Sequence, residues 1–267
     1  MLDPQSFIDH KDQFLELVQQ GALVFCNHSG GKDSQAMYLL LRRYVPRSQL
    51  IIIHADLGNE VEWDGVKEHI RATTDARPLE LAYAYWNTGK PANLLDYIEH
   101  RGKWPSKGQR YCTSGLKRGP IQREIRRICA EHFGDDAKQI AINCMGLRSA
   151  ESTERSKLDA WQVNKDLTVN KRKDRTVYDF NCILSMTEKE VFDAIDDAGQ
   201  KPHPMYAKGL GRLSCSFCIF ACDKQLKLAT KERPELAQKY VNLEAKIGHT
   251  FRHKKSLAEI TGLTPTN

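Results

Sequence analysis

Short apolar runs that alternate with amphipathic segments are the feature of this sequence that most restricts its fold. The runs typical of buried strands cover residues 22–27 (ALVFCN), 50–55 (LIIIHA), 79–83 and 139–144 (QIAINC). The segments typical of helices cover residues 33–44, 61–73 and 116–132. Because strands that alternate with helices pair in parallel, the sequence predicts an α/β fold with a doubly wound parallel sheet.

The pattern changes after residue 145. Residues 146–176 are polar and lack a repeat, so we expect a loop that faces the substrate. Thr187 and Glu190 form a capping-box pair that predicts a helix over residues 188–198. The other expectations are a first helix from Asp3-Pro4 to about Gln20, a loop with at most one helical turn over residues 86–111, and a helical tail over residues 223–260.

These patterns indicate one large α/β domain with an appendage. We expect residues 1–200 to form the α/β domain and residues 201–267 to form a C-terminal helical subdomain that contains cysteines.

The composition is that of a globular protein. Hydrophobic residues make up 40% of the chain, charged residues make up 28%, and the mean hydropathy is −0.55. These values exclude a disordered or fibrous chain. No apolar run reaches the ~18–20 residues of a membrane span. The N-terminus is charged and lacks the apolar core of a secretory signal. We therefore expect a cytoplasmic protein with no membrane partner, in which disulfides are rare.

Positive charge is concentrated in one stretch. Residues 101–127 contain nine basic side chains and a single acidic one, Glu124, whereas the whole chain carries a net charge of +6. Such a concentration indicates a local anionic partner. The alternative is a solvated loop and helix rich in lysine and arginine.

A glycine-rich loop, Ser29–Ser34 (SGGKDS), lies directly between the first expected strand and its helix. Ligands of α/β sheets bind at this position, the carboxyl end of a parallel strand. Gly30 and Gly31 allow a tight turn that presents backbone N–H groups to an anion, and the helix N-terminus adds partial positive charge. The loop does not fit the G-x-x-x-x-G-K-[ST] pattern of ordinary P-loops.

The SGGKDS loop resembles the PP-loop of the ATP pyrophosphatases, the adenine nucleotide alpha hydrolase-like (HUP) proteins. The resemblance implies that the loop holds the pyrophosphate of ATP, with Mg²⁺, while the α-phosphorus is attacked. The second expected strand ends in His54-Ala55-Asp56, which is similar to the edge that contacts adenosine in this family. The alternative for Asp56 is a carboxylate that caps its own loop.

Three further segments resemble the PAPS reductase-like branch of the family. Residues 110–120 are similar to CC-x-x-x-K-x-x-P, with Cys112, Lys117 and Pro120 matched and Thr113 in place of the second cysteine. Residues 146–155 are similar to G-x-R-x-x-E-S-x-x-R, and residues 209–222 to G-x-x-R-x-x-C-x-x-C. All four motifs occur in the family order.

The resemblance assigns roles to individual residues. The implied ATP-binding residues are Ser29, Gly30, Gly31, Lys32, Asp33, Ser34, Asp56, Gly146 and Arg148. The implied catalytic residues are Lys32, Asp33, Arg148 and Arg155. Lysine and arginine would neutralise phosphate charge as it develops, and Asp33 would hold the loop or the metal.

The eight cysteines fall into two groups. Cys26, Cys129, Cys144 and Cys182 lie in apolar runs and are expected to be small buried hydrophobes. The resemblance implies that Cys112, Cys215, Cys218 and Cys222 bind a metal centre, with Cys222 replacing the ligand lost at Thr113. A [4Fe–4S] cluster is the preferred interpretation, and zinc or no metal are the alternatives.

One departure from the family pattern bears on function. PAPS reductases carry a nucleophilic cysteine in a C-terminal tail, and this sequence has no cysteine after Cys222. The resemblance is therefore to ATP pyrophosphatases that adenylate an acceptor for sulfur insertion, most like the DNA phosphorothioation proteins of the DndC and SspD types. It implies a cysteine desulfurase as partner and DNA as acceptor, contacted by residues 101–127 and 171–175. The alternatives are a sulfonucleotide (PAPS or APS) reductase that uses another thiol, a tRNA thiolation ATPase, and a non-enzymatic nucleotide-sensing or DNA-binding subunit.

Overall fold

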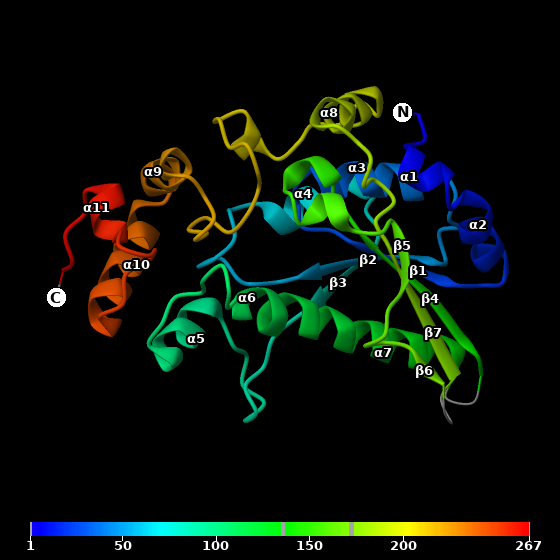
Figure 1. Ribbon diagram of the computed structural model, residues 1–267, viewed down its shortest axis with the longest axis horizontal. Helices are drawn as coiled ribbons and strands as arrows, with labels where there is room; N and C mark the ends of the chain where they lie inside the picture. Colours follow the sequence, from blue (N-terminus) through cyan, green and yellow to red (C-terminus); the bar gives the residue numbers. More distant parts are fainter. Residues whose placement is uncertain (1, 135–136, 171–173, 267) are drawn as a thin grey trace. The chain divides into compact units, whose positions relative to one another are not determined.

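The computed structural model describes residues 2–134, 137–170 and 174–266 (Figure 1). The chain divides into two compact units, each built from separated stretches. Unit 1 comprises Met1–His54, Gly65–Ala82 and Ile121–Lys208, and unit 2 comprises Ala55–Asp64, Tyr83–Pro120 and Gly209–Asn267. This division differs from the single boundary near residue 200 expected from the sequence, because unit 2 includes two stretches from the first half of the chain.

Unit 1 is built on a sheet with the strand order β3-β2-β1-β4-β7-β5, in which β6 also pairs with β7. The strands are β1 (Leu23–Asn27), β2 (Leu50–Ala55), β3 (Leu79–Ala82), β4 (Gln139–Met145), β5 (Trp161–Val163), β6 (Val169–Asn170) and β7 (Asp174–Phe180). β1 pairs in parallel with β2 and β4, and β4 pairs in parallel with β7. β5 and β6 run antiparallel to β7. The predicted α/β fold with a mostly parallel, doubly wound sheet is confirmed.

The loop expected over residues 146–176 is wrong in part, because β5, β6 and the start of β7 lie in it. The buried positions of β7 are Arg175, Val177 and Phe180, and Arg175 Nε donates to the carbonyl of Leu167 at 2.9 Å. A buried arginine interrupts the apolar pattern by which strands are found in a sequence.

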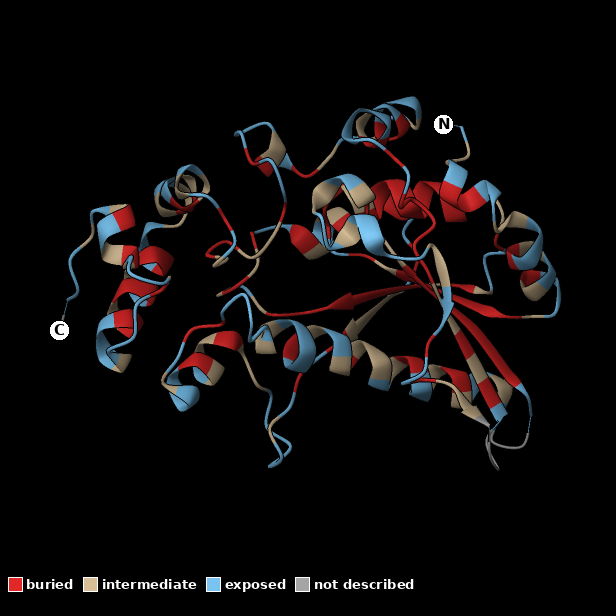
Figure 2. Cartoon of the chain, viewed as in Figure 1, coloured by how far each residue is buried: buried red, intermediate tan, exposed pale blue. Residues whose placement is uncertain are grey.

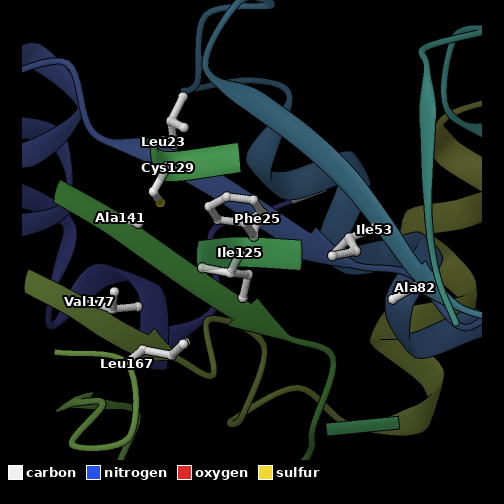
Figure 3. Packing of buried hydrophobic residues seen from close by; sticks show 9 residues of the cluster. All are labelled: Leu23, Phe25, Ile53, Ala82, Ile125, Cys129, Ala141, Leu167 and Val177. Atoms are coloured by element: carbon white, nitrogen blue, oxygen red, sulfur yellow. The ribbon is translucent and has the colours of Figure 1, made fainter. Parts of the chain in front are cut away.

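Helices cover both faces of the sheet. α7 (Gly119–Phe133) lies on one face and α3 (Lys32–Leu41) on the other (Figure 1). Figure 3 shows Ile125 and Cys129 of α7 beside Phe25 of β1. The cluster consists of Leu23, Phe25, Ile53, Ala82, Ile125, Cys129, Ala141, Leu167 and Val177. Its compact side chains fix α7 against the sheet.

α3 is buried on nearly all sides, as the red ribbon of Figure 2 shows. It packs against α8 (Glu188–Asp197), which begins at the capping box expected from the sequence. Thr187 N donates to Glu190 Oε2 at 2.7 Å, and the Glu190 N–H donates to Thr187 Oγ1 at 3.3 Å. This double layer of helices holds the start of α3 in place.

Two expected helices differ in their bounds. The first is divided into α1 (Gln5–Ile8) and α2 (Lys11–Gln19). The second, α4 (Val66–Thr73), begins later than residue 61, because Gly65 adopts φ 78° directly before it. A left-handed residue cannot continue a helix, so residues 61–65 form turns instead.

Unit 2 is helical. Its helices are α5 (Leu94–Arg101), α6 (Tyr111–Thr113), a π-helical turn η1 (Ser114–Arg118), α9 (Asp223–Glu232), α10 (Pro234–Ile247) and α11 (Leu257–Thr261). α5 corrects the loop expected over residues 86–111, and its cap is Asn93, whose side chain accepts the N–H of Asp96. The helical tail expected over residues 223–260 consists of three helices.

Aromatic rings form the centre of unit 2. The ring centroid of Trp104 lies 5.7 Å from that of Tyr240 and 5.0 Å from that of Phe251. The centroids of Phe217 and Tyr240 lie 4.8 Å apart. The buried carboxylate of Glu244 accepts backbone N–H groups from the segment that leads into α11. These contacts join stretches that are far apart in the sequence. Within the residues that the structure describes, no helix has the length and hydrophobicity needed to cross a membrane.

Candidate functional site

The loop between β1 and α3 has the backbone geometry of an anion-binding site. Gly30 adopts φ 77°, and Gly31 directly precedes the first helical residue. Among the described residues, the N–H groups of Gly31, Asp33 and Ser34 have no acceptor. Since these groups cluster at the positive end of a ten-residue helix, they are suited to bind a phosphate group.

The Ser34 hydroxyl holds the loop closed. Its Oγ donates to the carbonyl of Gly31 at 2.9 Å and accepts the N–H of Ser29 at 3.1 Å. The Ser29 hydroxyl lies 3.3 Å from the same oxygen. Both serines implied as ATP-binding residues therefore first serve to shape the loop.

His28 is a site residue that the sequence reasoning missed. It is buried, its Nδ1 accepts the N–H of Gly30 at 3.1 Å, and its carbonyl oxygen accepts a hydrogen bond from His54 Nδ1 at 2.9 Å. Its Nε2 is buried without a partner among the described residues. Burial, together with the nearby imidazoles of His54 and His69, lowers the pKa of His28 to about 3. The ring is therefore neutral at physiological pH, and Nδ1 keeps the lone pair that holds the Gly30 turn.

The side chain of Lys32 is buried and paired within the structure. Its side chain is only 2% exposed, and its ammonium lies 3.2 Å from Glu188 Oε1 and 3.5 Å from Asp33 Oδ2. The ammonium also lies over the rings of Phe192 and Tyr206, at 5.8 and 5.3 Å from their centroids. The side chain thus links the start of α3 to α8, and its charge is already compensated. The role of a phosphate-binding cation, which the resemblance implies for Lys32, stays a prediction.

A backbone group of Lys32 is also engaged. Its N–H donates to the hydroxyl of Tyr206 at 3.0 Å, in the turn η4 (Pro204–Tyr206). Tyr206 therefore occupies one donor of the helix N-terminus, and no motif in the sequence points to this tyrosine.

Asp33 and Arg148 form a buried ion pair beside the loop. Arg148 Nε donates to Asp33 Oδ1 at 2.5 Å, and the arginine is 5% exposed. The backbone N–H of Arg148 donates to Glu151 Oε2 at 3.0 Å, and Glu151 also pairs with Arg155. The structure thus brings Lys32, Asp33 and Arg148 together. Arg155 is linked to this group only through Glu151. Each implied catalytic cation already has a carboxylate partner.

Gly146 is required for packing. A Cβ atom at this position would lie 3.0 Å from both the Cα and the N of Ser34. The chain that leaves β4 therefore passes directly against the start of α3. This close approach allows Arg148 to reach Asp33. Gly146 is therefore needed for packing, and its implied role in ATP binding stays a prediction.

Asp56 lies in unit 2 and caps its own loop. Its Oδ1 accepts the N–H of Gly58 at 2.8 Å. This contact is the alternative that the sequence left open, and a role in adenosine binding remains a prediction.

Three of the four predicted metal ligands surround one lysine in unit 2. Lys117 Nζ lies 3.9 Å from Cys215 Sγ, and the pKa of Lys117 is raised by Cys215 foremost, with smaller contributions from Cys218 and Cys112. Burial raises the pKa of the Cys112 and Cys215 thiols. Cys222 differs, because it is exposed and directly precedes α9, where its N–H donates to Gln225 Oε1.

The spacing of the sulfur atoms bears on the kind of metal. No three cysteine sulfurs in the described part of the chain lie within 4.8 Å of one another. Thiolates bound tetrahedrally to one zinc at ~2.3 Å would lie about 3.8 Å apart. As placed, the cysteine sulfurs of the described residues do not form a tetrahedral zinc site, and the kind of metal stays a prediction.

The other four cysteines have no such setting. Cys26, Cys129, Cys144 and Cys182 are fully buried, which confirms the prediction that they are small core residues. Burial raises the pKa of the Cys129 thiol to about 12. All four thiols are therefore packed in the interior as small side chains.

The basic stretch is divided into two parts. Arg127 on α7 pairs with Glu80, Glu124 and Glu131. In unit 2, the exposed side chains of Arg101, Lys103, Arg110 and Arg118 have no carboxylate partner among the described residues. The exposed side chain of Arg126 on α7 also has no carboxylate partner among the described residues. Both parts therefore offer charge to an anionic partner, and unit 2 offers more of it.

The second basic segment expected to contact DNA, residues 171–175, lies only partly within the described residues. Lys171, Arg172 and Lys173 lie outside the described residues. Arg175 is buried and bonded to a backbone carbonyl, so it is not available to phosphates.

The fold and the loop define an α/β protein with an anion-binding site at the carboxyl end of its first strand. The model of the phosphoadenosine phosphosulfate reductase domain matches residues 24–221, and the chain belongs to this family. The family expected from the four motifs is thereby confirmed, whereas the DNA phosphorothioation type within it is not tested.

Two curated proteins are similar in sequence. An uncharacterised 37.8 kDa protein of Escherichia phage 186 is 29% identical over 175 residues, which cover 66% of this chain and 48% of that protein. An uncharacterised protein of Methanocaldococcus jannaschii is 25% identical over 221 residues, which cover 83% of this chain and 47% of that protein. The chain spans about half the length of these relatives.

Two solved structures are similar at a lower level. The phosphate complex of phosphoadenylyl-sulfate reductase from Candida auris matches with a TM-score of 0.48 and 14% identity, over 80% of this chain and 97% of that one. The U34-tRNA thiolase NcsA from Methanococcus maripaludis, with its [4Fe–4S] cluster, matches with a TM-score of 0.35 and 17% identity, over 85% and 69%.

Proposed function

We propose that this protein is an ATP pyrophosphatase that adenylates an acceptor so that sulfur can be inserted. The observation that carries the proposal is the loop between β1 and α3. Its N–H groups at Gly31, Asp33 and Ser34 have no acceptor among the described residues and lie together at a helix N-terminus. Such a group of donors binds a phosphate chain without a long side chain.

The loop suits a pyrophosphate leaving group. Fixed backbone donors stabilise negative charge as it develops on pyrophosphate and need no rearrangement during the reaction. An acceptor oxygen attacks the α-phosphorus and forms a new P–O bond, while the bond from the α-phosphorus to the bridging oxygen breaks. The electron pair leaves with pyrophosphate, which the loop retains as a unit.

Asp33 and Arg148 are suited to the reacting phosphate. In the structure they neutralise each other at 2.5 Å. A Mg²⁺ ion that arrives with ATP prefers a carboxylate oxygen, which Asp33 provides. Arg148 is then available to the α-phosphate, where its planar guanidinium matches the phosphate oxygens.

Unit 2 is proposed to supply the sulfur chemistry. Cys112, Cys215 and Cys218 would hold a [4Fe–4S] cluster, with Cys222 as the fourth ligand only if the start of α9 rearranges. These cysteines would hold the group at which sulfur from a cysteine desulfurase, reduced to the sulfide level by a thiol, attacks the adenylated acceptor and displaces AMP. Partly buried Lys117 compensates the charge of the thiolates. We propose DNA in the cytoplasm as the acceptor.

A second candidate is sulfonucleotide reduction, because the whole matched domain is that of the PAPS reductases. It would use the same loop for the phosphates of PAPS or APS and a thiol other than a tail cysteine. A tRNA acceptor is the third possibility and would leave the ATP chemistry unchanged.

The test is product analysis with ATP labelled at the α-phosphorus, in the presence of Mg²⁺. We expect AMP and pyrophosphate, and we expect Arg148→Gln to reduce their release about a hundredfold or more. Arg123→Gln is the matched control, because this arginine lies on α7 and pairs with Glu124 outside the loop. ADP as the main product would contradict the proposal, and catalytic sulfite release from PAPS with a thiol reductant would favour the reductase.

A further inference from the structure

We propose that unit 2 carries a binding surface for single-stranded nucleic acid, formed by exposed aromatic rings among unpaired cations. This aromatic–basic surface consists of Tyr83, Tyr85, Phe220, Arg101, Lys103, Arg110 and Arg118. The inference rests on the proposed function for the type of substrate and adds the form in which the nucleic acid binds.

The aromatic side chains are unusually accessible. Tyr83, Tyr85 and Phe220 are 38%, 46% and 49% exposed, and they are the exposed aromatic side chains of the described residues. Tyr83 and Tyr85 flank Ala84, which is only 6% exposed. Alternation along an extended segment therefore turns both tyrosines to solvent on one side. Rings of this size stay in water only at an energetic cost, so their exposure favours a ligand.

A stacked column supports this segment from within unit 2. Trp86 stacks on Tyr97, with 4.3 Å between the ring centroids and an interplanar angle of 13°. Tyr97 in turn stacks on Tyr111, with 6.4 Å between the centroids and an angle of 23°. The guanidinium of Arg101 lies 4.7 Å above the ring of Tyr111. The column holds the backbone next to Tyr85 and fixes Arg101 over Tyr111 at its other end.

Four exposed cations of unit 2, Arg101, Lys103, Arg110 and Arg118, have no carboxylate partner among the described residues. Residues 83–120 contain seven lysine or arginine side chains and two carboxylates. One carboxylate, Glu99, pairs with Lys246, and the other, Asp96, accepts from the Asn93 side chain at the start of α5. Arg110 lies 4.7 Å above the ring of Phe220. Positive charge and an exposed ring are thus presented together.

This combination fits a single strand better than a duplex. Phosphates of either form would contact the cations. Only unpaired bases present faces that can stack on tyrosine or phenylalanine rings or on an arginine plane. An acidic peptide would satisfy the charge and leave the rings exposed.

Fluorescence anisotropy without ATP tests the inference independently of the pyrophosphatase reaction. The probes are a labelled DNA strand of about 12 nucleotides, the same strand in a duplex, and an RNA strand of the same sequence. We expect the single DNA strand to bind more tightly than the duplex. The double variant Tyr83→Ala, Tyr85→Ala should weaken strand binding about tenfold or more and leave duplex binding nearly unchanged.

Two matched arginine pairs separate specific contacts from net charge. Arg110→Ala with Arg118→Ala should reduce the salt dependence of strand binding by about 0.7 in logarithmic slope for each lost phosphate contact. Arg123→Ala with Arg127→Ala removes the same charge from side chains that pair with carboxylates, and should change the slope little. Val163→Ala, an exposed apolar position in unit 1, is the control for the tyrosine variant.

Three results would overturn the inference. One is equal affinity for strand and duplex. Another is tyrosine variants that bind the strand like the original chain while circular dichroism shows them folded. The third is competition by polyglutamate as effective as that of the oligonucleotide. Tighter binding of the RNA strand would confirm the surface and replace DNA as the proposed acceptor.

Discussion

The two units use the same types of residue in opposite ways. In unit 1, four cysteines are fully buried, and Arg148 beside the loop and Arg123 and Arg127 on α7 pair with carboxylates. In unit 2, cysteines lie around a lysine or in solvent, and several arginines have no carboxylate partner among the described residues. Residue type alone therefore does not identify a ligand-binding group, and its partners must be known as well.

The difference has a physical cause. A sheet with helices on both faces can bury thiols as small apolar groups, and its charges are stable only when paired. Unit 2 has a small aromatic core around Trp104 and a large surface. Charges and thiols on such a surface cost little, and they remain available to ligands.

The largest expected effect concerns the cysteines. Protein purified without oxygen should contain about four iron and four sulfide ions per chain. Cys215→Ser and Cys218→Ser in unit 2 should abolish the visible absorption of the cluster, because each removes a ligand. Cys26→Ser and Cys144→Ser in unit 1 should keep it. Equal iron loss in both sets, or one zinc without sulfide, would contradict the contrast between the units.

The next effect concerns Gly146. Gly146→Ala should reduce ATP turnover about a hundredfold, because the new methyl group would push the backbone of Ser34 and misplace the loop. Gly108→Ala in unit 2 is the control, since no atom lies within 4 Å of the added carbon and the residue has no left-handed backbone. Similar kinetics for both variants would show that the close approach is not needed.

A smaller effect is expected at His28. His28→Phe should weaken nucleotide binding about tenfold, because the buried N–H of Gly30 loses its acceptor. His28→Asn should retain most of the affinity, since its Oδ1 can take the place of Nδ1. Isothermal titration with a non-hydrolysable ATP analogue measures both, and an asparagine variant as weak as the phenylalanine variant would remove the hydrogen bond from the explanation.

The same histidine should make stability depend on pH. Its pKa is about 3 in the folded protein and about 6.5 in the unfolded chain, so only the unfolded chain takes up a proton between these values. The free energy of unfolding should therefore fall by up to about 1.4 kcal/mol per pH unit as the pH decreases below 6.5. Urea unfolding of His28→Asn should show a shallower decrease.

The smallest effect is expected at Lys32. Lys32→Met should reduce turnover less than tenfold, because the ammonium is paired with Glu188 and packed against Phe192. If Lys32 stabilised the leaving phosphate, its removal would reduce turnover about a hundredfold. Steady-state kinetics distinguish the two outcomes, and Glu188→Gln should affect the melting temperature more than turnover.

The sequence predicts the centre of unit 1 well, for a clear reason. β1, β2 and β4 are continuous apolar runs, and the glycine loop follows one of them directly. β7 escapes prediction because Arg175 and Asp179 interrupt its apolar pattern and are satisfied only by partners elsewhere, Leu167 and Asn143. The sequence does not predict α5, because few positions of this helix are buried and its apolar pattern is weak.

The sequence predicts which residues form the candidate site, but it predicts much less well which contacts their side chains make. The motifs identify Asp33 and Arg148, which the structure places in contact. The direction of Lys32 depends on Glu188 and Tyr206, which no local pattern connects to the loop. His28 stands next to the motif but outside it, and only its burial shows that it shapes the loop.

The chain passes from one unit to the other at five points, after His54, Asp64, Ala82, Pro120 and Lys208. Unit 1 can therefore close during synthesis once Lys208 has left the ribosome, whereas unit 2 waits for its last stretch. Until then, Trp104 lacks Tyr240 and Phe251, its ring partners from α10 and the segment before α11. Such late, distant contacts slow folding and leave apolar surface open to aggregation. The aromatic core of the helical unit can therefore close only after its last stretch has been made.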